Sequence, residues 1–426
     1  MNILTDDRYH DQGLHNFDHN LNQPRHRWYP FKEGFSAELV SKAIQSISIT
    51  SKEPYRILDP FGGSGTSPLT AILSGHVAHA VEVNPFCAFT ARVKCSTTRP
   101  RATKFWKQLD ELSILAAKAR SKSPLEGQST FTKTKGVEKW LFNTEVIRGF
   151  QSVSEKLEEM NCGFKSAFRL AAMRAAMDCC NARKDGKALR YLRDWKERDF
   201  AARDFAQQFR ANCIQFREDA EMAPLKKEGQ AVIRSGDSRN ALQKLPPKSF
   251  HLFITSPPYL NSFDYSDVYR PELFLGGYVS TNQELRKLRL RTLRSHVQVD
   301  WGGATNVNSS LLKGPLDELK ESQSLWSSKL PTMVEAYFHD MNRVLKEAHR
   351  VLKIGAEAWL VVSTSAYGGV QIPVDLILAD LGVKLGFDLD GVYVLRSLRA
   401  AGQQQSSFGN VGLPLRESLI VLKRVK

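Results

Sequence analysis

Two short stretches of this 426-residue chain carry residues whose types and spacing suit chemistry. Residues 59–66 read DPFGGSGT, and residues 256–259 read SPPY. Each stretch follows an apolar run, so each is expected where a buried strand ends. Two successive prolines remove two backbone donors and fix two φ angles, so a central strand cannot continue through the second stretch. The chain therefore predicts a glycine loop and a rigid polar-to-aromatic corner.

The glycine loop predicts a ligand site. Gly62, Gly63 and Gly65 allow a ligand to approach the backbone closely, and the helix expected after them offers free N–H groups to an anion. A phosphate loop would end in Gly-Lys followed by Ser or Thr, which is absent here. Pro68 stands where a dinucleotide fingerprint has its third glycine, which also disfavours a nicotinamide oxidoreductase. The remaining interpretation is S-adenosylmethionine, which presents a carboxylate and an amino group instead of a pyrophosphate.

Two further acids follow predicted strands. Glu82 ends the strand about 20 residues after the loop, where a carboxylate can accept both hydroxyls of a ribose. Asp237 follows a third strand and can accept an adenine amino group. Taken alone, each acid is better explained as a helix cap or a solvated loop residue than as a ligand-binding residue. Together they mark the carboxyl edge of a parallel sheet, where open α/β sheets bind ligands, so neighbouring Val83, Asn84 and Ser238 are expected in the same site.

The hydrophobic pattern predicts a doubly wound, mostly parallel α/β sheet. Strand signals stop after the second strand, and the next 130 or so residues are helix-like before strand patterns return. The expected organisation is a mobile N-terminal arm (1–24), a cofactor-binding half (25–99), a helical insertion (100–229) and a catalytic half (230–426) with a basic insertion at about 276–330.

The charge balance favours a polyanionic partner. Lys and Arg number 60 against 45 acids, a formal net charge of +15, which makes nucleic acid the leading candidate and a merely basic protein the alternative. A solvated face is the alternative for the basic clusters too. The predicted phosphate-contacting residues are Arg286, Lys287, Arg289, Arg291, Arg294, Arg396 and Arg399.

The sequence shows no pattern typical of a zinc site, a disulfide framework, a secreted protein or a membrane protein. None of the six cysteines forms a C-x-x-C pair, so neither zinc nor a disulfide framework is expected, and no metal is predicted. The polar start carries no signal-peptide core, and no apolar run is long enough to span a bilayer. A cytoplasmic protein with reduced thiols is expected.

DPFGGSGT followed by TSPPY resembles the amino-methyltransferases of DNA, which make N4-methylcytosine or N6-methyladenine. The resemblance covers roughly residues 25–95 and 230–426, and residues 100–229 match nothing we can name. It implies a seven-stranded Rossmann-like sheet, S-adenosylmethionine as cofactor and double-stranded DNA as partner. It also implies a segment near Trp28 that closes over the methionine end of the cofactor. The implied cofactor-binding residues are Lys32, Phe35, Asp59, Pro60, Phe61, Gly62, Gly63, Ser64, Gly65, Thr66, Glu82, Val83, Asn84, Asp237 and Ser238.

The resemblance makes Ser256, Pro257, Pro258 and Tyr259 the catalytic motif. An exocyclic amino nitrogen is a poor nucleophile because its lone pair is delocalised into the ring. The Ser256 hydroxyl and the rigidly held Pro257 carbonyl suit acceptance of its hydrogens, and Tyr259 can stack on a base flipped out of the duplex. In the family, serine in the first position goes mostly with cytosine N4, and Asp or Asn mostly with adenine N6.

The alternatives are N6-adenine methylation of DNA, methylation of RNA, or a catalytically silent DNA-binding module on the same fold. The expected setting is a bacterial or phage restriction-modification system, with a cognate endonuclease as a further partner. Family members with this motif order carry target recognition after the catalytic half. Here it is expected in the helical insertion, in residues 276–330, or in both.

Overall fold

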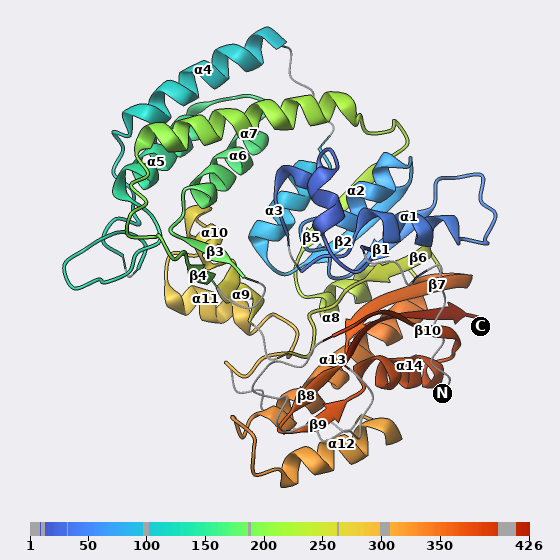
Figure 1. The fold of residues 1–426 in the computed structure, drawn as a ribbon. Coiled ribbons are helices and arrows are strands. Elements are labelled where there is room, and N and C mark those ends of the chain that lie inside the picture. The colour runs from blue at the N-terminus through green and yellow to red at the C-terminus, as the bar shows by residue number, and fades with distance from the viewer. Residues whose placement is uncertain are drawn as a thin grey trace.

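The computed structural model describes residue 9 and residues 13–31, 33–96, 102–128, 130–185, 189–261, 264–298, 307–398 and 415–426. Its centre is a seven-stranded sheet in the order β10-β11-β7-β6-β1-β2-β5 (Figure 1). Strands β7, β6, β1, β2 and β5 run parallel, and β11 is antiparallel to both of its neighbours. The predicted mostly parallel seven-stranded α/β sheet is confirmed.

The elements follow the expected alternation of strands and helices. The strands of the sheet are β1 (Arg56–Asp59), β2 (Val77–Glu82), β5 (Gln230–Ser235), β6 (Phe250–Thr255), β7 (Leu352–Ser363), β10 (Phe387–Ser397) and β11 (Arg416–Arg424). The helices around it are α1 (Ala37–Gln45), α2 (Thr66–Leu73), α3 (Pro85–Lys94), α8 (Ser238–Ala241), α9 (Tyr265–Val268), α10 (Arg270–Leu275), α11 (Asn282–Arg289), α12 (Ser310–Glu321), α13 (Leu330–Val351) and α14 (Val374–Lys384). In the described ranges, no helix has the length and apolar character to cross a membrane.

Apolar cores cover both faces of the sheet. On one face, α1 and α2 pack on Ile57, Leu252 and Trp359. On the other face, α13 and α14 pack on Leu58 and Phe253. All six residues of β6 are buried, as expected for a parallel strand covered on both sides. The sheet is therefore a rigid platform for whatever its carboxyl edge carries.

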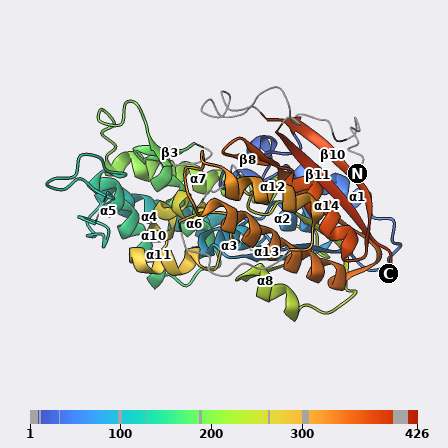
Figure 2. The same cartoon turned by 90° about the horizontal axis from the view of Figure 1, so that it is seen from below.

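A helical region lies beyond the β5 edge of the sheet (Figures 1 and 2). Its helices are α4 (Ala102–Lys118), α5 (Thr144–Glu159), α6 (Lys165–Asp178) and α7 (Ala202–Met222). A short hairpin of β3 (Ala182–Lys184) and β4 (Leu189–Tyr191) interrupts them. The sequence predicted no strand here, because two three-residue strands are too short to display an alternating pattern.

The described part of the predicted N-terminal arm, from Gly13 onward, packs against the rest of the protein. The side chains of Leu14 and Asn20 are fully buried, and that of Phe17 is 3% exposed. Asn20 accepts a hydrogen bond from the Ala37 backbone at 2.8 Å and donates to the Phe35 carbonyl at 3.1 Å, which holds the segment against the start of α1. The polar composition hid this contact, because two buried apolar residues and one satisfied amide are enough to dock a short segment.

Asp219 on α7 joins the helical region to the N-terminal segment. Its fully buried carboxylate accepts from the backbone of Arg25 at 3.0 Å, the Arg27 guanidinium at 2.6 Å and the Trp28 indole at 3.0 Å. The Trp28 ring also stacks on Phe216 of α7, with ring centroids 4.6 Å apart. One acid therefore satisfies donors from three residues of the segment that leads to the sheet.

We predict that Asp219→Ala lowers the free energy of unfolding by about 3 kcal/mol, because it leaves buried donors and a guanidinium without a partner. Urea denaturation followed by tryptophan fluorescence measures the change. Asp110→Ala is the matched control, since that carboxylate pairs with Arg210 of α7 at the surface, where an ion pair contributes about 0–1 kcal/mol. Equal losses in the two variants would contradict the prediction.

Candidate active site

A cavity of about 340 Å³ lies at the carboxyl ends of four adjacent parallel strands, β6, β1, β2 and β5. Its volume is within the range of small-molecule sites. The sequence-predicted residues that line it are Phe35, Asp59, Phe61, Gly62, Gly63, Ser64, Thr66, Glu82, Val83, Asn84, Asp237, Ser238, Ser256, Pro257, Pro258, Tyr259, Arg291 and Arg396. The glycine loop, both strand-end acids and the SPPY corner thus share one cavity.

Asp59 binds three elements together at the end of β1. Its buried carboxylate accepts from the Phe61 backbone at 3.0 Å, the Ser67 hydroxyl of α2 at 2.6 Å and the Thr255 hydroxyl of β6 at 2.7 Å. Burial raises the pKa of this carboxyl to about 6, and these hydrogen bonds act in the opposite direction. The acid therefore holds the glycine loop against the strand that leads to the SPPY corner.

Glu82 is the last residue of β2, and each of its two carboxylate oxygens accepts one hydrogen bond from the backbone. One oxygen accepts from the Gly63 backbone at 2.8 Å and the other from the Asn84 backbone at 2.7 Å. Each oxygen keeps a further acceptor position, which suits the two hydroxyls of a ribose. Burial raises the pKa of Glu82 to about 7. Asn84 is the N-cap of α3 and accepts from Phe86 at 3.0 Å.

Two glycines of the loop have a backbone conformation and close neighbours that exclude any larger residue. Gly63 has φ +50°, and a Cβ there would lie 2.8 Å from the Phe31 ring. Gly65 has φ +93°, and its Cβ would lie 2.9 Å from the Cα of Ala91 on α3. Gly65 and Pro60 do not line the cavity. Gly65 allows two helices to approach closely, and the Pro60 carbonyl accepts a hydrogen bond from Ser238.

The SPPY corner directly follows β6. Ser256 and Tyr259 are half-buried and line the cavity. The Tyr259 hydroxyl donates to Glu417 of β11, and the Tyr259 backbone N–H lies 3.4 Å from the Tyr265 hydroxyl. Burial, assisted by Glu417, raises the pKa of Tyr259 well above its usual value, so the phenol stays protonated and acts as a donor.

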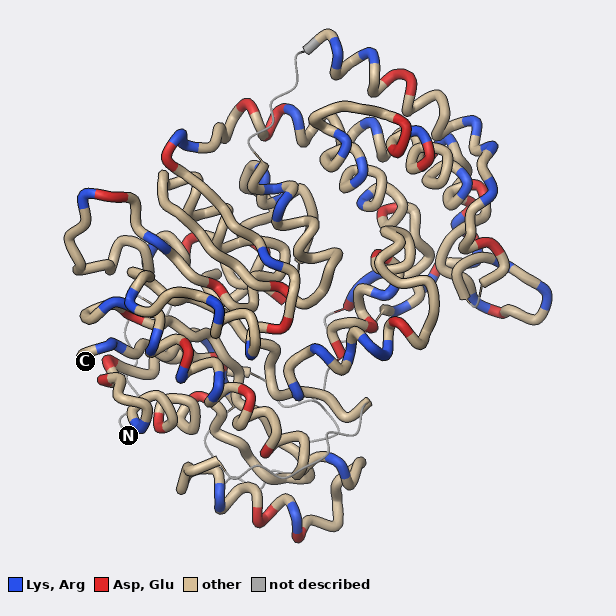
Figure 3. Tube along the Cα trace, turned by 180° about the vertical axis from the view of Figure 1, so that it is seen from behind, with Lys and Arg blue, Asp and Glu red and all other residues tan. Residues whose placement is uncertain are grey.

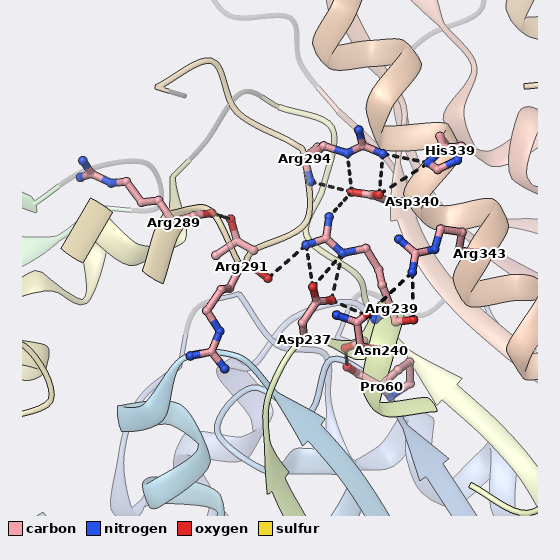
Figure 4. Close-up of polar contacts among 12 residues, drawn as sticks. Pro60, Asp237, Arg239, Asn240, Arg289, Arg291, Arg294, His339, Asp340 and Arg343 are labelled. Atoms are coloured by element: carbon pink, nitrogen blue, oxygen red, sulfur yellow. Dashed lines mark hydrogen bonds and ion pairs between the residues drawn. The ribbon is translucent and has the colours of Figure 1, made fainter. Parts of the chain in front are cut away.

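Asp237 is held by a network of alternating charges (Figure 4). Nη2 of Arg239 lies 2.7 Å from one Asp237 oxygen, and Nη1 of the same guanidinium lies 2.7 Å from fully buried Asp340 on α13. Arg294 contacts the other side of Asp340, also at 2.7 Å. Asp237 also accepts from the Arg239 backbone at 2.9 Å. The carboxylate is therefore oriented by α13, and it caps α8 in addition to lining the cavity.

The predicted basic cluster divides into two sets. Arg289 is paired with Asp264 and Asp267, and Arg294 with Asp340, so these two guanidinium groups are used inside the protein. Arg286, Lys287 and Arg291 are exposed, and Figure 4 shows the Arg291 guanidinium directed away from the network. Figure 3 shows that other Lys and Arg residues are spread over the molecule, with acids among them on α4 to α7.

Sequence reasoning missed several residues of the cavity. Glu33 lines it and accepts from the Tyr269 hydroxyl at 2.6 Å, and burial raises the pKa of Glu33. Tyr265 and Glu417 also line it. Glu33 lies between the predicted residues Lys32 and Phe35, and Tyr265 lies 6 residues after Tyr259. This proximity was the only signal for them in the sequence. The predicted residues Lys32 and Arg399 lie outside the described part of the chain.

The sheet order and the cavity at its carboxyl edge are those of a Rossmann-like α/β fold, and the cofactor that fits this site is S-adenosylmethionine. Two curated relatives that align along most of the chain are type II methyltransferases. M.AvaI of Nostoc sp. is 25% identical over 91% of this chain and 84% of its own length. M.BsoBI of Geobacillus stearothermophilus is 24% identical over 100% of this chain and 90% of its own.

The other comparisons add no functional argument. No family model matches the chain. A solved SAM-dependent methyltransferase from Methanosarcina mazei is 11% identical, covers 90% of this chain and 96% of its own, and superposes with a TM-score of 0.30. Similarity at that level carries no weight for substrate or mechanism.

We predict that cofactor affinity rises with pH because of Glu82. The carboxylate form accepts ribose hydroxyls, whereas the protonated form loses an acceptor. With a pKa of about 7, the ionised fraction and hence the affinity should increase about tenfold from pH 6 to pH 8. Calorimetric titration with S-adenosylhomocysteine measures this. Glu82→Gln should bind more weakly with little pH dependence, and a wild-type affinity that is flat across this range would contradict the assignment.

Proposed function

We propose that the chain is a DNA methyltransferase that transfers the methyl group of S-adenosylmethionine to the exocyclic amino group of a flipped base, with cytosine N4 as the target. The observation that carries the proposal is the SPPY corner, which lines the same cavity as the glycine loop and Glu82. The similarity to two type II methyltransferases over most of the chain supports DNA as the substrate.

The cavity residues suit this reaction without covalent catalysis. The cofactor supplies an electrophilic sulfonium methyl group. The Ser256 hydroxyl and the Pro257 carbonyl accept the amino hydrogens, which moves the nitrogen lone pair out of conjugation with the ring. On gaining the methyl group the nitrogen would lose one of these protons to water, and the cofactor would leave as the neutral thioether S-adenosylhomocysteine. Tyr259 stacks on the base and holds the nitrogen in line with the methyl carbon. The one cavity cysteine, Cys87, has its pKa raised well above the usual value by burial, so it is a poor nucleophile.

The choice of cytosine rests on Ser256. A serine hydroxyl can accept from an amino group and also donate to a ring nitrogen, and serine at this motif position goes mostly with cytosine N4 in the family that the chain resembles. N6-adenine methylation and RNA methylation use the same geometry. A silent DNA-binding module is disfavoured, because Asp59, Glu82 and the SPPY corner are all present and close together.

The deciding experiment incubates the purified protein with methyl-tritiated S-adenosylmethionine and unmethylated duplex DNA, followed by digestion and chromatography of the nucleosides. Label in N4-methylcytosine is the expected result. Label in N6-methyladenine would overturn the choice of base and keep the enzyme class. Cofactor binding without any label in DNA would overturn DNA methylation and direct the same assay to RNA.

Ser256 and Tyr259 should affect turnover far more than cofactor binding. We predict that Ser256→Ala lowers kcat about a hundredfold, that Tyr259→Ala has a comparable effect, and that cofactor affinity changes in neither by more than about twofold. Single-turnover methylation and calorimetry separate the two quantities. Glu82→Gln serves as a control for the opposite effect, because this variant should lose cofactor affinity. A collapse of cofactor binding in Ser256→Ala would refute this division of roles.

The exposed set of the basic cluster is proposed to contact DNA phosphates. We predict that Arg286→Ala/Lys287→Ala/Arg291→Ala reduces the slope of log Kd against log salt by about 2 to 3, since each lost phosphate contact removes about 0.9. Fluorescence anisotropy with duplex DNA at several salt concentrations measures the slope. Arg294→Ala, which loses an internal pair instead, should lower thermal stability and leave the slope unchanged. A slope that falls in Arg294→Ala and stays unchanged in the triple variant would contradict the proposed DNA contacts.

A further inference from the structure

Tyr259 is connected through its hydroxyl to the two strands that end the described chain. The phenol donates to Oε1 of Glu417 on β11, and Nε of Arg396 on β10 lies 2.7 Å from the Oε2 of the same carboxylate. The Glu417 side chain is only 3% exposed, whereas that of Arg396 is 46% exposed. A ring, a buried acid and a partly exposed base thus form a row along the cavity wall.

The buried acid has no other evident structural task. Neighbouring Arg416 and Ser418 both bond to Asp375 of α14, at 2.7 Å each, so they fasten the opposite face of β11. The bonds that the structure gives to the Glu417 side chain go to Tyr259 and Arg396. Burying a carboxylate is costly unless it is paired, and here the pairing is directed at the aromatic residue of the catalytic corner.

Fixing the hydroxyl fixes the long axis of the ring. Rotation about the Cα–Cβ bond would carry the phenol oxygen away from Glu417, so the hydrogen bond holds that torsion in one rotamer. Stacking requires the ring at a defined place and a defined distance from the incoming base. Two prolines already hold the backbone end of Tyr259, so the Glu417 bond completes the constraint from the far end of the side chain.

We propose that Glu417 is a positioning residue for Tyr259, held in place by Arg396, which fixes where the stacking ring lies before a base enters the cavity. The inference rests on the proposed function, because the position of the ring matters only if a base stacks on it. Glu417 does not touch the reacting atoms and acts through the phenol alone.

The test is a double-mutant cycle in the full chain, with wild type, Tyr259→Phe, Glu417→Ala and the double variant. The readouts are the single-turnover rate of methyl transfer to unmethylated duplex DNA and the affinity for S-adenosylhomocysteine. Glu417→Ala should slow transfer about tenfold in the wild-type background and by no more than about twofold in the Tyr259→Phe background. Cofactor affinity should stay within about twofold throughout.

Two further variants separate positioning from support of the fold. Glu417→Gln keeps an acceptor for the phenol, so it should transfer within about threefold of wild type. Ser418→Ala removes a hydrogen bond from the next residue of the same strand and should not slow transfer in either background. If Glu417→Ala does not fold, Arg396→Ala, which removes the partner that holds the Glu417 carboxylate, takes its place in the cycle. It should slow transfer in the wild-type background and not in the Tyr259→Phe background, and an equal cost in both would overturn the proposal.

Each outcome decides the inference. A cost of Glu417→Ala that is equal in both backgrounds would identify a merely structural residue and overturn the proposal, as would a Glu417→Gln variant as slow as Glu417→Ala. A wild-type protein that binds the cofactor and transfers no label to DNA would instead overturn the proposed function, and this inference with it.

Discussion

The buried carboxylate of Asp59 is the interaction on which the rest of the site depends. A carboxylate taken out of water must have its lone pairs satisfied by protein donors, and here the donors come from the glycine loop, the first turn of α2 and the last residue of β6. The glycine loop and the strand that carries the SPPY corner therefore cannot shift independently. The raised pKa of Asp59, about 6, indicates that its hydrogen bonds offset only part of the burial cost.

The positions of the principal motifs were predictable, because each follows a strand with a strong local signal. The continuous apolar run of β6 and the prolines after it identify the corner, and the β1–loop–α2 pattern identifies the cofactor loop. Glu417 could not be found in this way. It stands in a strand pattern where its charge looks like a solvent-facing position, and its partner Tyr259 is 158 residues earlier in the chain. Contacts between distant segments leave no periodic trace in a sequence.

The same limit applies to the basic cluster. Arg289 and Arg294 look identical to their exposed neighbours in the sequence, since the acids that pair with them lie on α9 and α13 or just before α9. Arg239 is likewise used between Asp237 and Asp340. A formal charge of +15 therefore overstates the number of guanidinium groups that face a polyanion. Several of them instead fix the positions of acids around the cavity.

The placement of β11 has a consequence for how the protein is made. This strand follows β7 and β10 in the chain and yet pairs between them. During synthesis on the ribosome, the parallel strands and the SPPY corner emerge before β11, and β10 cannot join the sheet until β11 has arrived. Glu417 arrives with it. A nascent chain can therefore assemble its glycine loop before its SPPY corner is anchored, so the two sides of the cavity form at different times.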